Sequence, residues 1–184
     1  IPAIDPERHR LVVTGDVRRP LAFRYEDLLA YPLRSAIWFL ECSGNSWRNS
    51  LPEALDLTAG ALSGLVSGAE WTGVPLSVLL DEAGLGRDAR WVIARGSDAS
   101  GMARSVPLEL CRDEAILALY QNGEPLRPSQ GYPMRLFVPG CEGNLSVKWL
   151  TALHVQAGPA YTRDETSKYT DLRADGRAEM FSLR

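Results

Sequence analysis

The sequence predicts a single α+β domain in which mixed β-sheets are combined with short helices. The first observation is size and composition, because 184 residues of which 45% are hydrophobic can bury a sufficient core without crosslinks. The second is the local pattern: short β-prone runs are separated by Gly and Pro, and brief helical segments do not alternate regularly with strands. The third is continuity, since no internal repeat or low-complexity stretch divides residues 1–184.

The first part of the chain predicts three strands and one helix. Residues 10–14 form a β-prone run closed by a Gly-Asp turn, and residues 21–23 follow a proline as a second short strand. Residues 25–31 are expected to form a brief helix that ends at the next proline, because proline clashes with the preceding turn. Residues 35–41 are apolar and β-prone, so we expect a buried strand with Cys42 at its exit.

The middle of the chain predicts a long connection, two helices and a strand. Residues 46–69 are mostly small and polar, and connections of this length are usually functional or mobile. A helix is expected over residues 75–83, with proline in its first turn and Gly84 as a left-handed stop. The same pattern predicts a helix over residues 107–111, and residues 90–95 are typical of a strand.

The last part of the chain predicts a hairpin and two further strands. Residues 115–121 and 124–126 flank Asn122-Gly123, which is the strongest hairpin signal in the sequence. Residues 133–138 and 147–155 are expected to be strands on either side of a glycine-rich loop.

Charge and cysteine usage exclude several function classes. Lys and Arg number 20 against 23 Asp and Glu, which leaves no basic excess to attract a nucleic-acid backbone. The longest apolar runs are far shorter than the ~20 residues that cross a bilayer. The three cysteines form no C-x-x-C pattern or haem-attachment motif, and His9 and His154 belong to no triad or metalloprotease pattern.

Cys42 is the first candidate for chemistry. It follows the predicted strand and precedes Ser43, Gly44 and Asn45, whose backbone is flexible and rich in donors. A thiolate in such a place suits a nucleophile or a soft metal ligand. The alternative, equally weighted on this motif alone, is an inert cysteine in the core. A catalytic thiol also needs a histidine partner, and neither histidine lies in a segment that indicates one.

Two further segments hold candidate residues. In residues 131–149, glycines allow close backbone approach, while Arg135 and Lys148 supply positive charge for an anionic group such as phosphate. The alternative is a surface loop with solvated basic residues. Residues 164–171 have the composition of an exposed connector, and Tyr169 within them could donate a proton or a hydrogen bond into a site.

The motifs follow one another in a specific order. They are Cys42-Ser43-Gly44-Asn45, Glu70-Trp71-Thr72-Gly73-Val74-Pro75-Leu76, Gly96-Ser97-Asp98, Gln130-Gly131-Tyr132-Pro133-Met134-Arg135, Val138-Pro139-Gly140, Val147-Lys148-Trp149 and Lys168-Tyr169. This order resembles the sulfite oxidase family of molybdopterin enzymes over nearly the whole chain. Within that family, residues 41–45, 142–144 and 165–171 are most similar to the molybdenum subunit of bacterial sulfane dehydrogenase.

The resemblance implies a sulfite oxidase-type molybdopterin-binding fold that holds a molybdenum–molybdopterin cofactor, with no haem in this chain. It implies that Cys42 ligates molybdenum, which explains why no histidine partner is needed, and that Tyr169 is an active-site tyrosine beside the metal. The residues implied in cofactor binding are Cys42, Ser43, Gly44, Asn45, Asp98, Gln130, Arg135, Ser146, Val147 and Lys148. The implied reaction is oxygen-atom transfer to a reduced sulfur compound in the periplasm, with electrons passed to a cytochrome c acceptor or subunit.

Departures from the family pattern bear on the substrate. Ser46 and Trp47 stand where sulfite oxidases and plant nitrate reductases have paired arginines, and Leu145 replaces a further anion-binding arginine. Without these guanidinium groups a pocket holds small dianions poorly, which disfavours sulfite and nitrate and favours persulfide-type sulfur carried on a protein. Arg48 could compensate in part, which keeps sulfite as an option. Cys141 stands where the sulfane dehydrogenase pattern usually has tryptophan.

The resemblance also predicts that residues 1–184 are the central cofactor domain of a longer protein. The family's N-terminal segment and its C-terminal dimerisation domain have no counterpart in this sequence. Two alternatives stay open at this point. One is a catalytically empty domain of the same fold that serves in binding or assembly, and the other is a thiol redox module that uses Cys42 and Cys141.

Overall fold

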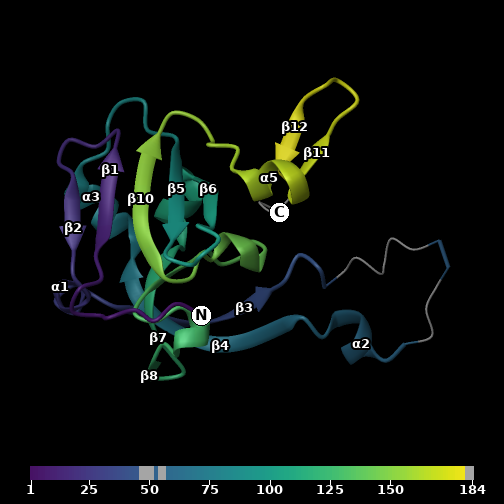
Figure 1. Cartoon of the computed structure of the whole chain (residues 1–184), viewed down its shortest axis with the longest axis horizontal. Coiled ribbons are helices and arrows are strands. Elements are labelled where there is room, and N and C mark those ends of the chain that lie inside the picture. The colour runs from purple at the N-terminus through teal and green to yellow at the C-terminus, as the bar shows by residue number, and fades with distance from the viewer. Residues whose placement is uncertain (46–51, 54–56, 181–184) are drawn as a thin grey trace.

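In the computed structural model, residues 1–45, 52–53 and 57–180 are described, and they form an α+β fold with mixed sheets, as predicted (Figure 1). The strands are β1 (Leu11–Gly15), β2 (Leu21–Phe23), β3 (Arg34–Glu41), β4 (Val66–Pro75), β5 (Trp91–Gly96), β6 (Ala103–Pro107), β7 (Ile116–Gln121), β8 (Glu124–Pro125), β9 (Arg135–Phe137), β10 (Leu150–Gln156), β11 (Thr170–Leu172) and β12 (Ala178–Met180). The helices are α1 (Tyr25–Leu28), α2 (Ala59–Ser63), α3 (Leu76–Ala83), α4 (Leu108–Asp113) and α5 (Arg163–Lys168), with 3-10 turns η2 (Pro128–Gln130) and η3 (Gly143–Leu145).

Two five-stranded sheets carry the fold. The first has the order β2-β1-β10-β5-β6, in which β1 and β10 are parallel and the other neighbours are antiparallel. The second runs β3-β4-β7-β8, with β9 also pairing to β7, and all its pairs are antiparallel. A separate two-stranded ribbon, β11-β12, follows α5 and projects away from the two sheets (Figure 1).

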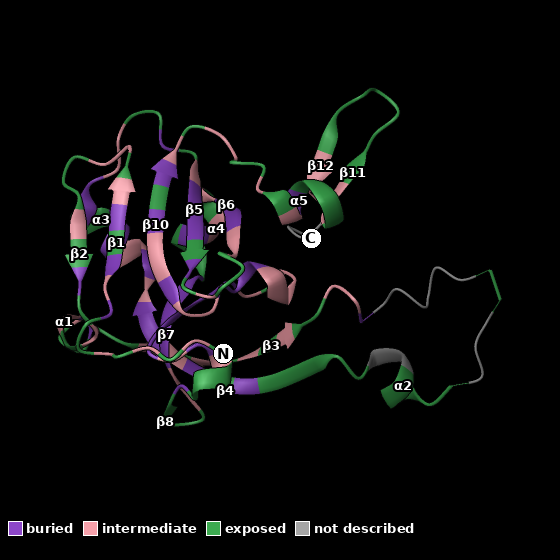
Figure 2. Cartoon of the chain, viewed as in Figure 1, coloured by how far each residue is buried: buried purple, intermediate pink, exposed green. Residues whose placement is uncertain are grey.

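The core lies where the two sheets and the short helices meet, and strand β7 is central to it. Leu117 and Leu119 of β7 belong to the larger buried cluster, whereas Ile116 and Ala118 belong to a second cluster around Trp71. Successive side chains of a strand point to opposite faces, so β7 is buried on both of them. Figure 2 shows this buried interior, while the projecting ends of β3, β4 and β11-β12 are largely exposed.

Several expectations from local sequence are confirmed. The β7–β8 hairpin turns at Asn122 (φ 52°) and Gly123 (φ 78°), the positive pair that a two-residue hairpin requires. Helix α3 ends at Gly84, which has φ 70°. The prolines before α3 and α4 differ slightly from expectation, because Pro75 and Pro107 end the preceding strands and stand just outside the helices.

The first helix and the strand before Cys42 differ from prediction. Helix α1 ends at Leu28, and residues 29–31 continue as i→i−3 turns because the proline that follows disfavours helical geometry. Strand β3 is not buried: Ile37 and Phe39 are 75% and 73% exposed. β3 is an edge strand, and only its other face, with Trp38 and Leu40, packs against the second core cluster.

Three further expectations need correction. The connection predicted over residues 46–69 contains α2, and β4 already begins at Val66 because it pairs with the end of β3; the rest of this connection lies largely outside the described residues. The strands expected over 133–138 and 147–155 are shorter, since Trp149 adopts φ 53° and the Val147 carbonyl instead accepts a bond from Leu136. The connector expected over 164–171 contains α5, whose Glu165 is buried.

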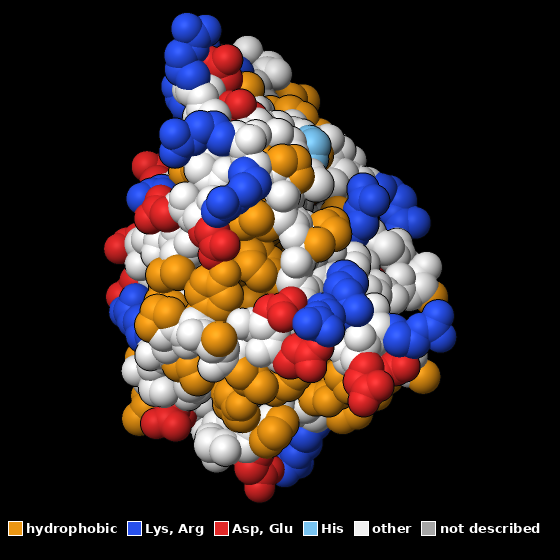
Figure 3. Space-filling view, turned by 90° about the vertical axis from the view of Figure 1, so that its left-hand side faces the viewer, with side chains coloured by type: hydrophobic (Ala, Val, Ile, Leu, Met, Phe, Trp, Pro, Cys, Tyr) orange, Lys and Arg blue, Asp and Glu red, His pale blue; other side chains and the backbone are white. Residues whose placement is uncertain are grey.

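The surface fits the charge analysis. On the face that Figure 3 shows, basic and acidic side chains are interspersed and do not form a patch of one sign. Among the described residues, no helix is both long enough and apolar enough to cross a membrane.

Candidate functional site

Cys42 lies directly after β3, as predicted, and its side chain is exposed. The backbone around it is tied to the strand that follows in the sheet. The Cys42 amide donates to the Leu65 carbonyl at 2.9 Å, and the Asn45 amide donates back to the Cys42 carbonyl at 2.8 Å. The thiol is therefore held at the end of a strand by a hydrogen-bonded turn.

The residues after Cys42 shape this turn. Asn45 is buried: its amide nitrogen donates to Glu41 Oε1 at 2.7 Å and its amide oxygen accepts from the Leu65 amide at 2.8 Å. A Cβ at Gly44 would lie 3.8 Å from Cys42 Sγ, an ordinary contact distance, so Gly44 lies beside the thiol. Asn45 thus organises the thiol loop.

A cavity of about 350 Å³ brings six of the predicted site residues together, a size within the usual range for small-ligand sites. These six are Cys42, Ser43, Arg135, Ser146, Lys148 and Tyr169. Its other lining residues are Leu40, Glu41, Leu65, Met102, Gly143 and Asn144. The cavity joins the end of β3, β9 and the loops around η3, and the end of α5, which are far apart in the sequence.

Arg135 is the buried cation of this cavity. Its Nη1 donates to the Gln130 carbonyl at 3.1 Å and its Nη2 to the Ser146 carbonyl at 2.5 Å, and the guanidinium lies 5.2 Å from the Trp71 ring. Its Nε is buried and finds no hydrogen-bond partner among the described residues. Burial lowers the pKa of Arg135 to about 10, so it remains charged at neutral pH.

Lys148 adds a second positive charge. Its Nζ donates to the Ser129 carbonyl at 2.9 Å and lies 4.9 Å from the Trp149 ring. Burial, and then repulsion from Arg135, lower the pKa of Lys148, although Asp98 acts in the opposite direction. Two neighbouring cations held partly by neutral carbonyl groups fit an anionic group such as a phosphate.

The remaining predicted residues do not line the cavity. Gln130 supplies the carbonyl that accepts from Arg135. Burial disfavours the charged form of Asp98 and acts to raise its pKa. Hydrogen bonds from the Ser100 hydroxyl and the Met102 amide outweigh burial, so the pKa of Asp98 is lowered. Val147 is fully buried in the core, so its side chain faces away from the site. Roles of these residues in cofactor binding stay predictions.

Ser146 and Tyr169 line the cavity and are themselves fixed. Ser146 Oγ accepts a hydrogen bond from the Val138 amide at 3.1 Å and is buried. Tyr169 follows helix α5, and its amide donates to the Glu165 carbonyl at 3.2 Å. The ring of Tyr169 lies 5.0 Å from the guanidinium carbon of Arg104, a buried residue that the sequence pattern did not single out.

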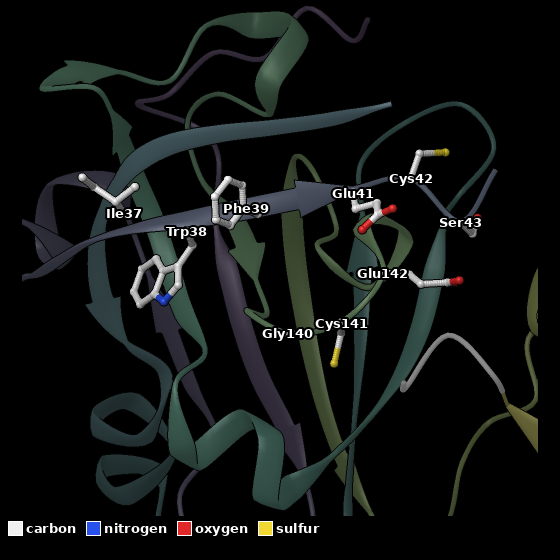
Figure 4. Close-up of a pocket in the computed structure, with 9 residues that line it drawn as sticks. All are labelled: Ile37, Trp38, Phe39, Glu41, Cys42, Ser43, Gly140, Cys141 and Glu142. Carbon is white, nitrogen blue, oxygen red and sulfur yellow. The ribbon is translucent and has the colours of Figure 1, made fainter. Parts of the chain in front are cut away.

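A second cavity, about 450 Å³ in volume, shares Glu41, Cys42 and Ser43 with the first (Figure 4). It is lined by Ile37, Trp38, Phe39, Glu41, Cys42, Ser43, Gly140, Cys141 and Glu142. Burial, and repulsion from Glu41, raise the pKa of Glu142 despite a hydrogen bond from Asn144 at 3.0 Å. Two carboxylates, Glu41 and Glu142, therefore lie beside the Cys42 thiol in this cavity.

Cys42 and Cys141 share this second cavity, but their thiols point in different directions in Figure 4. Cys141 is half-buried, and burial followed by the charge of Glu142 raises its pKa. Cys111 is fully buried, which raises its pKa still further. The three thiols thus differ sharply in their access to solvent, and the two less accessible ones, Cys141 and Cys111, have a raised pKa.

We expect the three cysteines of the purified, metal-free chain to react with iodoacetamide in a fixed order. Only the thiolate is alkylated, so exposed Cys42 should react first, Cys141 more slowly, and Cys111 only after unfolding. Peptide mass spectrometry over a time course at constant pH measures this order. Equal rates for Cys42 and Cys111 would contradict the arrangement described above.

Comparison with known proteins decides the family. The model of the oxidoreductase molybdopterin-binding domain matches residues 1–163. The chain belongs to this family. The molybdopterin-binding domain described here is similar to sulfite oxidase of Rattus norvegicus, with 33% identity over 181 residues, and to nitrate reductase of Phytophthora infestans, with 34% identity over 167 residues.

These alignments cover most of this chain but only a minor part of each relative. The alignments span 92% and 84% of this chain but only 33% and 18% of the respective relatives. Among solved structures, the sulfane dehydrogenase SoxCD from Paracoccus pantotrophus is similar, with a TM-score of 0.88 and 42% identity. That match covers 98% of this chain and 46% of the SoxCD chain. The predicted sulfite oxidase-type fold is thereby confirmed.

The described residues fit a molybdenum–molybdopterin group. A soft thiol, Cys42, is exposed at the cavity, and the buried Arg135 offers an Nε that no described residue uses. A Cβ at Gly131 (φ 112°) would lie 3.1 Å from the Cβ atoms of both Arg135 and Lys148, so glycine lets this turn pack against the two cations. Among the described residues, no three His, Cys, Asp or Glu side chains are grouped so as to hold a metal ion. Ser46, Trp47 and Arg48 lie outside the described residues.

Proposed function

We propose that this domain is the catalytic molybdenum centre of an oxidoreductase that oxidises a reduced sulfur compound. The observation that carries the proposal is the 350 Å³ cavity, in which the exposed Cys42 thiol, the cations Arg135 and Lys148, and Tyr169 meet. When bound, the molybdenum cofactor supplies two-electron redox chemistry coupled to oxygen-atom transfer. Membership of the molybdopterin-binding family supports this reaction class.

In this proposal the protein residues bind the cofactor and orient the substrate. Cys42 provides the metal ligand, and Arg135 and Lys148, with Gln130, Asp98 and the segment around Ser146 and Val147, hold the pterin and its phosphate. Ser43, Gly44 and Asn45 keep the thiol loop in shape. Tyr169 lines the same cavity, and its proposed role is to orient a substrate by hydrogen bonding.

The proposed substrate is sulfane or persulfide sulfur, with sulfite as the competing choice. Transfer of one oxygen from water to such a sulfur releases two protons and two electrons. Glu41 and Glu142 stand beside Cys42 and repel small dianions, which disfavours sulfite. The 42% identity to a sulfane dehydrogenase also supports sulfane sulfur as the substrate. The proposal further includes a protein carrier for this sulfur, a cytochrome c acceptor and a periplasmic location.

Metal and pterin content of the purified protein test the proposal. The chain is produced with a molybdopterin supply, its molybdenum is measured by elemental analysis, and released pterin is measured by fluorescence after acid treatment. Both are expected, together with faster turnover of glutathione persulfide than of sulfite when ferricyanide is the acceptor. Absence of molybdenum and pterin would overturn the proposed function, whereas preference for sulfite would overturn only the substrate class.

The second candidate is a catalytically empty domain that serves in binding or assembly. One observation favours it: Leu145, at the position of a family arginine, is 1% exposed and lies in the core, so it contributes no charge to the cavity. A chain that carries neither molybdenum nor pterin would support this candidate, whereas a pterin fluorescence signal after acid release would reject it.

A further inference from the structure

Arg104 is a buried arginine directly behind the candidate site. It lies on β6 and is 2% exposed, although arginine is seldom buried without partners. Its Nε donates to Asn144 Oδ1 at 3.2 Å and its Nη1 to the Ala103 carbonyl at 2.8 Å. Its guanidinium also lies over the Tyr169 ring, 5.0 Å from the centroid. Two of these contacts, with Asn144 and Tyr169, are therefore made to residues that line the cavity.

Arg104 also lies near a carboxylate of the helix that precedes Tyr169. Asp164 Oδ2, on helix α5, is 3.9 Å from Arg104 Nη1. Tyr169 follows α5 directly, while Asn144 lies in η3 on another wall of the cavity. A single guanidinium thus connects β6 to two cavity-lining segments that are separate in sequence. Such a connection is stiff, because the planar group fixes direction as well as distance.

We propose that Arg104 is a positioning residue that holds Tyr169 and Asn144 in their places around the site. The proposal rests on the proposed function, in which Tyr169 orients the substrate. Arg104 does not line the cavity, so it acts through the two residues that do. A buried cation over the ring face restricts how Tyr169 tilts, and the bond to Asn144 fixes the opposite wall.

A second contact shows that Arg104 is not the anchor of α5 itself. The helix is attached to β6 through Glu165, which accepts hydrogen bonds from Ser105 and Thr162. Loss of Arg104 therefore leaves α5 attached while releasing the ring of Tyr169. The effect on the site can be separated from the effect on the fold.

The test uses Arg104→Met, which keeps an unbranched apolar stem and removes the charge and donors. Arg34→Met is the matched control, since Arg34 also lies over an aromatic ring, 5.4 Å from Trp38, and near a carboxylate, Glu114, but is distant from this cavity in the fold. Hydrogen–deuterium exchange on the purified chain is expected to rise over residues 163–172 in Arg104→Met and to stay unchanged there in Arg34→Met. If the methionine variant does not fold, Arg104→Lys is used in its place, with the same expected change in hydrogen–deuterium exchange.

Kinetics of the molybdenum-loaded protein give the second readout. Arg104→Met is expected to lower kcat by about 10- to 100-fold with little change in KM, because positioning is lost. In the Tyr169→Phe background the same substitution should have much less effect. If the losses of kcat caused by Arg104→Met and by Tyr169→Phe simply multiply in the double variant, the proposal is overturned. Unchanged hydrogen–deuterium exchange over residues 163–172 would also overturn it. If the chain binds no molybdenum, the proposed function fails, and the exchange result alone decides the role of Arg104.

Discussion

Cys42→Ala is expected to abolish molybdenum binding and activity while the fold stays intact. The proposed role gives the metal one protein ligand, so removing the thiol removes the protein's direct bond to it. The Cys42 side chain is exposed, and exposed substitutions usually change stability by about 0.5 kcal/mol or less. The thermal transition should therefore match that of the unaltered chain.

The variant also separates the metal from the pterin. Arg135 and Lys148 remain in place in Cys42→Ala, so part of the released pterin fluorescence should persist after the molybdenum is gone. Elemental analysis and pterin fluorescence on the same preparation measure the two components independently. Loss of both in equal proportion would show that Cys42 is needed for the whole cofactor.

Cys141→Ala is the matched control for this experiment. Cys141 belongs to the second cavity beside Cys42, but it is half-buried and its thiol points elsewhere (Figure 4). The Cys141→Ala variant should keep its molybdenum. A chain that loses metal with either alanine would favour a centre built from both thiols, and a Cys42→Ala chain with full metal content would contradict the proposed ligand.

Local signals in the sequence predicted the parts of the fold that neighbouring residues determine. Asn122-Gly123 specifies its hairpin because few other residues accept two positive φ values in succession. Gly84 ends α3 for the same physical reason. The placement of Cys42 at the end of a strand also followed from local β-propensity, because an apolar β-prone run stops there.

Features that depend on distant partners were not visible in the sequence. The outer face of β3 is apolar yet exposed, because the strand has a neighbour on one edge only. Arg104 looks like any surface arginine until β6 brings it against Asn144 and Tyr169. The composition of residues 164–171 predicts a solvent-exposed segment. Glu165 is buried only because the fold places Ser105 against it. The site residues were predicted from the resemblance to a family and not from spacing, and six of them line one cavity.

Glu165 is the other residue whose replacement should have a large effect. It is 1% exposed, and its carboxylate accepts hydrogen bonds from the Ser105 amide, from the Ser105 hydroxyl at 3.0 Å and from the Thr162 amide at 2.8 Å. Among the described residues, the buried hydrophobic side chains end at Val155, so α5 and the β11-β12 ribbon add nothing to the core. Glu165 is thus a buried attachment of this segment to β6, beside the Thr162 hydroxyl, which donates to the Ala103 carbonyl at 3.0 Å.

Glu165→Ala is expected to release the segment from α5 onward without unfolding the rest. Leaving a buried donor unpaired costs about 1–3 kcal/mol, so losing these bonds should weaken the attachment by about 3 kcal/mol. Limited proteolysis should then cut within residues 163–180, while the main thermal transition shifts little because the core is untouched. Tyr169-dependent activity should fall with the release.

Glu109→Ala provides the control for Glu165→Ala. Glu109 lies in the first turn of α4, a helix of six residues like α5, but it is exposed. Both substitutions remove an acidic side chain that favours a helix N-terminus, and only Glu165 is bonded to another strand. Equal proteolysis of the two variants would mean that the helix dipole, not the buried carboxylate, holds α5. Global unfolding of Glu165→Ala would place α5 within the cooperative core, contrary to the packing described above.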